Sequence, residues 1–318
     1  MIRKTAFSSQ PDHHSMGFPE APSGFTDTPA VRVGPAGWSY QDWAQIVYPR
    51  SRPTGFREVA YLAQFFDVLE INVSFYRAVP RATALRWADQ VAANSRFRFT
   101  AKLHRSFTHD GNPTDVEEIG FREMADTLTE AGRLGAVLVQ FPWSFRNTRE
   151  NLRYVSALLE RFAPYPLVVE MRHSSWNHPD FYTLLEDRQA GFCNVDQPVI
   201  RKSLEPTAIA TAPVAYVRLH GRNAKEWFGD SGRDARYNYL YSREELVPWK
   251  ERIQKLAGKA TNIYAITNNH FRGQAAANAL ELVSMLLEAP VPAPASLVAA
   301  YPQLEKCTVT EQGRLFSG

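Results

Sequence analysis

The chain has 318 residues, 44% of them hydrophobic and 22% charged, with a formal net charge of +3. This is a globular composition, long enough to bury a core without disulfides or structural metal. Two cysteines, Cys193 and Cys307, exclude a disulfide framework. Because neither a secretory signal nor a run of about 18 apolar residues is found, we expect a cytoplasmic protein without membrane association. The mild basicity permits an anionic ligand and does not require nucleic acid.

Three regions differ in composition. Residues 1–29 are rich in Ser, Pro, Gly and His, which predicts a flexible N-terminal tail. Residues 290–318 open with Pro and Ala, and we expect an irregular C-terminal tail there. The segment between them, 30–289, carries the regular patterns and is expected to form one domain.

Short apolar runs alternate with segments of helical periodicity through this domain. The expected strands are 31–34, 67–72, 97–103, 136–141, 167–171, 191–196, 214–220 and 262–269. The expected helices are 56–66, 83–92, 121–134, 150–162, 180–189, 244–258 and 273–288. Alternating strands and helices predict a parallel sheet covered by helices, and eight repeats favour a closed eight-stranded (β/α)₈ barrel, the TIM barrel.

The strands also alternate between an apolar face and a face that becomes polar toward the C-terminal end. In the second strand Leu69 and Ile71 oppose Glu70 and Asn72. A closed barrel explains both faces, since outward residues pack on helices and inward residues near the top line a site. An open sheet would bury both faces and leave charges unpaired, at a cost of several kcal/mol each.

These strand ends supply the candidate site. The proposed acids and bases are Glu70, Glu170 and Asp196, with His220 as the proton shuttle because its ordinary pKa lies near neutrality. Cationic side chains dominate the rim and suit phosphate or carboxylate oxygens, so we expect a small anionic or phosphate-bearing substrate. The expected substrate-binding residues are Trp38, Asn72, Tyr76, Lys102, Gln140, Arg172, His173, Trp176, Arg218, Asn268 and Asn269.

A purely structural alternative is that these charges form buried ion pairs, such as Glu70 with Lys102 and Glu170 with Arg218. A divalent metal is a further possibility if Glu70, Glu170, Asp196 and His220 converge, although no short ligand spacing is present. No nucleotide-cofactor motif occurs: the GPAG at 34–37 lacks the phosphate-binding pattern.

Two other features point to binding. The segment 221–242 exceeds normal loop length and is predicted to act as a lid, with Gly229 and Gly232 as hinges. A basic patch could contact nucleic acid; its members are Arg50, Arg52, Arg57, Arg77 and Arg81.

Several segments carry a family resemblance over about residues 31–288. They are GWSYQDW (37–43), EINVSFYR (70–77), FRFTAKLHRSFTH (97–109), VLVQFPWSF (137–145), VVEMRHSSW (168–176), YVRLHGRN (216–223) and TNNHFRGQAAANAL (267–280). They resemble the YecE-like family, also called domain of unknown function 72. The resemblance implies a TIM barrel and the strand-end positions named above, adding His109 and Gly221, but no reaction. One departure is KLHR at 102–105, where the family usually has a proline.

Three functional hypotheses follow. The first is an enzyme, a hydrolase or lyase, with Glu70 or Glu170 as base, His220 as acid, and Lys102, Arg172 and Arg218 holding substrate oxygens. The second is a metal-dependent, nucleic-acid-processing enzyme resembling barrel endonucleases at the level of fold. The third is a non-catalytic barrel that binds an anionic metabolite or nucleic acid.

Overall fold

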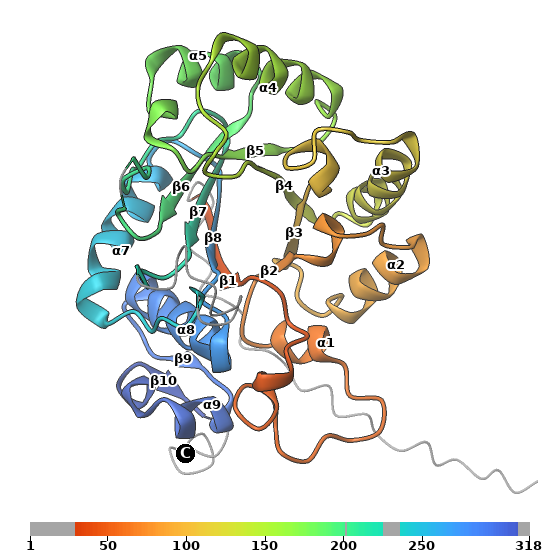
Figure 1. Cartoon of the computed structure of the whole chain (residues 1–318). Coiled ribbons are helices and arrows are strands. Elements are labelled where there is room, and N and C mark those ends of the chain that lie inside the picture. The colour runs from red at the N-terminus through yellow and green to blue at the C-terminus, as the bar shows by residue number, and fades with distance from the viewer. Residues whose placement is uncertain (1–28, 201, 225–235, 311–318) are drawn as a thin grey trace, which may run out of the picture.

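Eight parallel strands form the centre of the computed structural model, which describes residues 29–200, 202–224 and 236–310. The strands are β1 (Ala30–Pro35), β2 (Val68–Ile71), β3 (Arg98–Lys102), β4 (Leu134–Gln140), β5 (Leu167–Glu170), β6 (Gly191–Asp196), β7 (Val214–Leu219) and β8 (Asn262–Thr267). Their hydrogen-bonded order is β1-β8-β7-β6-β5-β4-β3-β2. The predicted single-domain TIM barrel and all eight strands are confirmed (Figure 1).

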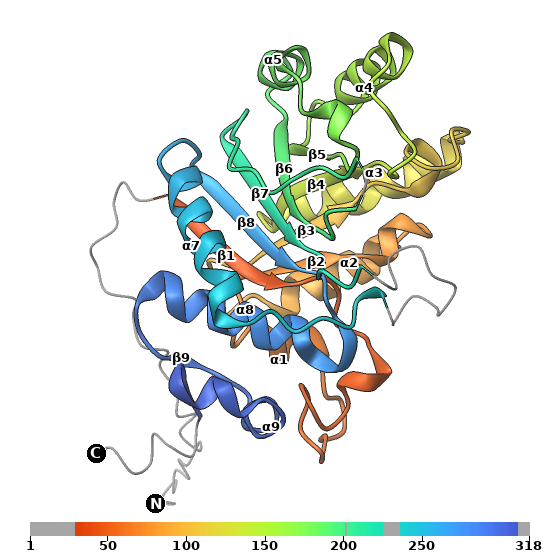
Figure 2. The same ribbon diagram turned by 60° about the vertical axis from the view of Figure 1, so that its left-hand side comes forward.

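Helices surround the strands on the outside (Figures 1 and 2). They are α1 (Glu58–Leu62), α2 (Arg81–Gln90), α3 (Asp115–Glu130), α4 (Arg149–Arg161), α5 (Pro179–Asp187), α7 (Arg243–Ala257) and α8 (Gln274–Leu287). α3 begins earlier than expected because Thr114 and Glu117 form a reciprocal capping box. The β6–β7 connection, residues 197–213, contains no helix in its described part. None of the described helices combines the length and apolarity needed to cross a bilayer.

The barrel closes where β1 meets β2. A single bridge joins Ala36 to Glu70, and the Gly37 amide donates to the Glu70 carbonyl at 2.9 Å. A Cβ at Gly34 would overlap the carbonyl oxygen of Val68, so only glycine allows this approach of the two strands. Closure at this end fixes the C-terminal tips of β1 and β2 side by side.

The expected irregular tail at 290–318 is wrong for its described part. Residues 291–309 form β9 (Val291–Pro292), α9 (Ala295–Ala300), a 3₁₀ turn (Pro302–Lys306) and β10 (Thr308–Val309). The proline-rich composition concealed buried side chains: Leu297 and Leu304 are fully covered, and this unit contacts α8. The other predicted tail, residues 1–29, lies outside the described residues except for its last position.

Candidate functional site

A network of buried charges occupies the barrel interior. Arg218, on β7, places Nη2 2.6 Å from Oε1 of Glu70 and Nη1 2.7 Å from Oε2 of Glu170. All three side chains are fully buried, and Gln140 accepts a further bond from Arg218 at 3.1 Å. Burial opposes ionisation of Glu170, yet the charges of Arg218 and Arg172 hold its pKa well below the ordinary value. Both acids therefore serve as ion-pair partners of Arg218, which argues against the predicted role as base.

His220 completes this network. Its Nε2 lies 3.1 Å from Oε1 of Glu170, which also accepts from Arg172 at 2.7 Å, and its Nδ1 lies 3.0 Å from Nδ2 of Asn268. Nη2 of Arg172, a donor, also lies 3.2 Å from Nε2. Because the Glu170 carboxylate only accepts and the amide nitrogen of Asn268 only donates, the ring proton is assigned to Nε2 and Nδ1 accepts from Asn268. Burial, and then the charge of Arg172, lower the pKa of His220 to about 3. His220 is thus a neutral, positioned imidazole and a poor proton shuttle near pH 7.

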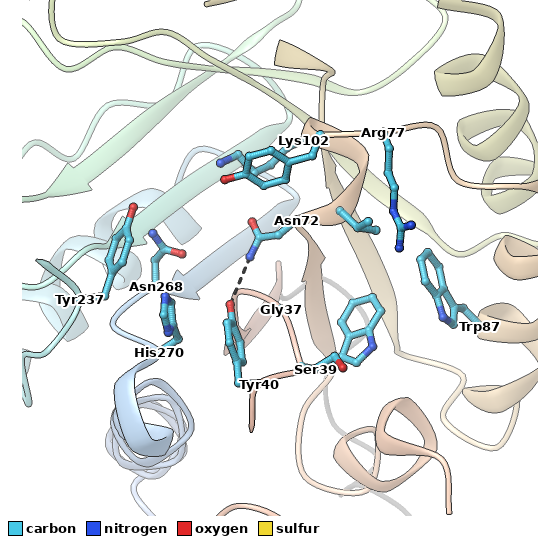
Figure 3. Close-up of a pocket in the computed structure, with 13 residues that line it drawn as sticks. Gly37, Ser39, Tyr40, Asn72, Arg77, Trp87, Lys102, Tyr237, Asn268 and His270 are labelled. Carbon is cyan, nitrogen blue, oxygen red and sulfur yellow. Dashed lines mark hydrogen bonds between the residues drawn. The ribbon is translucent and has the colours of Figure 1, made fainter. Parts of the chain in front are cut away.

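Above this network a cavity of about 420 Å³ opens at the C-terminal ends of β1, β2, β3 and β8 (Figure 3). Its walls are Gly37, Trp38, Ser39, Tyr40, Asn72, Val73, Tyr76, Arg77, Trp87, Lys102, Tyr237, Asn268 and His270. These described lining residues include the cations Arg77 and Lys102 and no acidic side chain. The charged side chains among these described walls are therefore both basic.

Lys102 ends β3 and faces this cavity (Figure 3). Its Nζ lies 4.5 Å from the centroid of the Phe75 ring. Burial, with a further contribution from the charge of Arg218, lowers the pKa of Lys102 to about 7. The expected pair between Glu70 and Lys102 is replaced by the pair between Glu70 and Arg218, whereas the expected pair of Glu170 with Arg218 is present.

Aromatic rings form the walls of the cavity. Trp38 meets Trp87 edge to face with centroids 5.1 Å apart, and Tyr40 stacks on His270 at 4.4 Å. Trp38, Asn72, Tyr76, Lys102 and Asn268 were predicted binding residues, and the structure places them together here. Trp87 and His270 were missed. Trp87 lies within α2, where an aromatic normally indicates core packing, while the position of His270 directly after the β8 asparagines was an available signal.

Asp196 lies apart from Glu70 and Glu170. Its two oxygens accept a forked pair of bonds from Arg222, at 2.9 and 2.7 Å, and the indole N–H of Trp249 on α7 also donates to it. It therefore ties β6 to the helix layer, which corrects its predicted place among the acids and bases. The four proposed metal ligands do not converge: within the described ranges, no three His, Cys, Asp or Glu side chains form a group able to hold a metal ion.

Two further predicted binding residues stabilise loops. Trp176 is fully buried, stacks on Phe145 at 5.6 Å and donates its indole N–H to the Phe145 carbonyl at 2.8 Å. His173 places Nδ1 2.9 Å from the Ser175 hydroxyl and accepts from the Ser175 amide at 3.1 Å. Neither lines the cavity, so both roles are structural.

Asn269 contacts the segment that was predicted to act as a lid. The Asn269 amide donates to the Tyr239 carbonyl at 2.7 Å and to Oδ1 of Asn278 at 2.8 Å, which anchors the end of the long 221–242 segment. The proposed hinges Gly229 and Gly232 lie outside the described residues. Tyr237, from the described end of this segment, lines the cavity.

The sequence profile described as "Protein of unknown function DUF72" matches residues 32–299. The chain belongs to the DUF72 family. It is similar to the UPF0759 protein YunF of Bacillus subtilis (strain 168), with 28% identity over an alignment of 272 residues that covers 80% of this chain and 94% of YunF. The predicted family resemblance is therefore confirmed.

Solved structures of the DUF72 family show the same architecture. TM1631 from Thermotoga maritima matches with a TM-score of 0.71 and 32% identity, covering 81% of this chain and 99% of its own. EF0366 from Enterococcus faecalis matches with a TM-score of 0.71 and 26% identity, covering 81% and 95%. These proteins carry no named activity, so the chemistry of this DUF72 protein has to be argued from its own cavity.

Proposed function

We propose that this DUF72 protein is an enzyme that acts on a small anionic molecule bound in the mouth cavity. The observation that carries the proposal is the cavity lining: Arg77 at the rim and Lys102 below it are the charged groups among the described walls, and both are cationic. Aromatic rings in the same walls suit a substrate that joins a planar group to a phosphate or carboxylate.

Lys102 is the proposed acid–base group. Its pKa of about 7 means that comparable amounts of ammonium and free amine exist near neutrality, the condition under which a side chain transfers protons most effectively. Glu70, Glu170 and Arg218 instead fix the electrostatic surroundings from below, because Arg218 pairs with both carboxylates and their other oxygens accept from Tyr216 and Arg172. Arg172, only 11% exposed, adds positive charge beside them.

The nucleic-acid alternatives receive less support. Two members of the basic patch are neutralised locally: Arg52 lies 3.5 Å from Glu58 and Arg81 lies 3.2 Å from Glu130. A cavity of this size suits a small molecule. We also infer a cytoplasmic location, which two free, buried cysteine thiols support.

Titration calorimetry with phenyl phosphate and inorganic phosphate at low ionic strength tests the binding site. We expect saturable binding that is tighter for phenyl phosphate, and weakened about tenfold, or about 1.4 kcal/mol, by Arg77→Gln. Arg149→Gln, an exposed arginine at the start of α4, is the matched control. Absence of saturable binding, or equal affinity in the Arg77 variant, overturns the anion site.

Turnover tests the enzymatic part of the proposal. A panel of sugar phosphates, nucleotides and 2-oxo acids is incubated with the wild-type protein and with Lys102→Met, and product is detected by mass spectrometry. We expect turnover that Lys102→Met abolishes. Phenyl phosphate binding without turnover of any panel member supports the non-catalytic barrel instead.

A further inference from the structure

The amine of Lys102 has an unusual environment for a lysine inside a protein. Buried lysines are normally paired with a carboxylate or held by several acceptors. The side chain of Lys102 is partly exposed, and its amine makes no hydrogen bond or ion pair with any other described residue. The centroid of the Phe75 ring lies 4.5 Å from Nζ. Its Nζ therefore faces the cavity without a fixed acceptor.

The neighbouring carboxylates are already engaged. Glu70 accepts from Arg218 at 2.6 Å and from the Tyr216 hydroxyl at 3.0 Å. Glu170 accepts from Arg218 at 2.7 Å on one oxygen and from Arg172 at 2.7 Å on the other. All four carboxylate oxygens of Glu70 and Glu170 therefore have donors. The two carboxylates lie near Lys102 but form no direct salt bridge with it.

This arrangement makes a substantial fraction of free amine available near neutral pH. An ammonium held in a salt bridge is a permanent cation, whereas an amine that faces a cavity and lies near two guanidinium groups loses its proton easily. The pKa of Lys102, lowered to about 7 by burial and by Arg218, agrees with that geometry. A free lysine amine in an apolar pocket is a nucleophile toward carbonyl carbon.

We propose that Lys102 forms an imine with the carbonyl group of the anionic molecule bound in the mouth cavity. The inference rests on the proposed function and narrows its substrate class to aldehydes and ketones that carry a phosphate or carboxylate. Arg77 lines the same cavity as Lys102 and is the cation available to hold the anionic group while the carbonyl carbon reaches the Lys102 amine (Figure 3).

The covalent step balances without any redox partner. The lone pair of Nζ forms a bond to the carbonyl carbon, the C=O π electrons move to oxygen, and a proton passes from nitrogen to oxygen to give a carbinolamine. The nitrogen lone pair then forms the C=N bond as the C–O bond breaks, and the oxygen leaves as water after taking up one proton. The product is a protonated imine, whose positive charge makes the adjacent C–H or C–C bond easier to break.

Two amide side chains line the same cavity and support this chemistry. Asn72 and Asn268 are cavity residues from the ends of β2 and β8. Nδ2 of Asn268 also lies 3.0 Å from Nδ1 of His220, which fixes its orientation. Nδ2 of Asn72 likewise donates to the Tyr40 hydroxyl at 3.5 Å. The second N–H of each amide nitrogen is the donor that can bond the carbonyl and carbinolamine oxygen as it gains negative charge.

Reductive trapping tests the proposal on the full-length protein. Pyruvate and glyceraldehyde 3-phosphate are incubated separately with the protein and sodium cyanoborohydride, and adducts are located by peptide mass spectrometry. We expect the adduct at Lys102, formed at pH 7 at least about tenfold faster than at the exposed Lys255, because an ordinary lysine with a pKa near 10.4 is almost fully protonated there. The rate should rise with pH around a midpoint of about 7.

Competition by phenyl phosphate distinguishes the imine at Lys102 from the anion site on which it rests. It should slow trapping at Lys102 and leave Lys255 unaffected, and Lys102→Arg should bind phenyl phosphate without forming the adduct. If phenyl phosphate binds but Lys102 is trapped no faster than Lys255, the imine is wrong while the anion site stands. If trapping is fast but phenyl phosphate neither binds nor competes, the nucleophile stands and the anionic substrate class is wrong.

Discussion

Arg218 and Glu70 stand 148 positions apart in the chain, and their side chains meet with Nη2 2.6 Å from Oε1 inside the barrel. The same guanidinium reaches Glu170, so one cation joins β2, β5 and β7. A buried network of this kind contributes more to a defined arrangement of strands than to net stability, because desolvation offsets most of the Coulomb attraction. It places two negative charges and one positive charge directly below the cavity.

Arg218→Met should destabilise the protein strongly. Removing the guanidinium leaves Glu70 and Glu170 buried without their shared cation, and we expect a loss of about 3–5 kcal/mol in the free energy of unfolding. Urea denaturation measures it. The triple variant R218M/E70Q/E170Q, which removes all three charges, should recover at least half of the loss. Equal stability of Arg218→Met and wild type would mean that the network is not formed.

The lowered pKa of His220 predicts that the free energy of unfolding falls in acid. Its pKa is about 3 in the folded protein and about 6.5 when unfolded, so the folded state binds fewer protons between these values. The contribution of neutral His220 is complete above the unfolded pKa and is lost as the pH falls toward 3, with a slope approaching about 1.4 kcal/mol per pH unit. Urea unfolding between pH 7 and pH 4 should show a shallower dependence for His220→Gln. An unchanged slope would contradict the assignment of a neutral, buried imidazole.

The barrel and its inward charges were predictable because a strand alternates faces with period two. Charges at Glu70, Glu170 and Arg218 stood opposite apolar neighbours, so the sequence indicated that they share an interior. Alternation does not identify partners, however. It could not show that Arg218, rather than Lys102, pairs with Glu70, since that choice depends on side-chain reach across the barrel.

Asp196 shows a second limit of prediction from strand alternation. In β6 the polar residues Asn194 and Asp196 alternate with Cys193 and Val195, so the period of two predicts that the polar side chains face the interior. In the structure Phe192 contacts Phe181 of α5, and Asp196, four positions later, likewise meets the helix layer through Trp249. The cavity aromatics in α2 and after β8 were hard to predict for a related reason, because their place depends on how the helices and loops fold back over the strand ends.

Lys102→Met should stabilise the protein while removing the turnover proposed above. The folded pKa of about 7 lies below the ordinary value near 10.4, so the folded state resists a proton that the unfolded chain accepts. This costs stability as the pH falls from about 10 toward 7, and methionine avoids the cost, giving a gain of about 1–3 kcal/mol at pH 7. Urea denaturation at pH 7 measures it, with Lys255→Met as the exposed control expected to change little. A destabilised Lys102→Met would show that the ammonium is favourably paired.

Asp196→Asn tests the corrected role of this acid. The forked ion pair with Arg222 and the bond from Trp249 should be weakened, which we expect to lower the free energy of unfolding by about 2–3 kcal/mol. Phenyl phosphate affinity should stay within about twofold of wild type, because a residue outside the cavity contributes little to binding. If the folded variant lost phenyl phosphate binding or turnover, Asp196 would have to belong to the functional site after all.

Gly37→Ala should damage the cavity specifically. Gly37 has φ +76°, and an added Cβ would lie 2.6 Å from the Tyr40 hydroxyl and 3.1 Å from Nδ2 of Asn72. We expect a loss of about 1–2 kcal/mol in stability from backbone strain and at least about tenfold weaker phenyl phosphate binding from the displaced side chains. Gly55→Ala is the matched control, since Gly55 has φ +80° and no described atom within 4 Å of an added Cβ. Both variants carry the same kind of backbone strain. Weaker phenyl phosphate binding in Gly37→Ala alone would therefore result from the crowding of Tyr40 and Asn72. Equal binding by the two variants would show that this wall of the cavity does not contact the ligand.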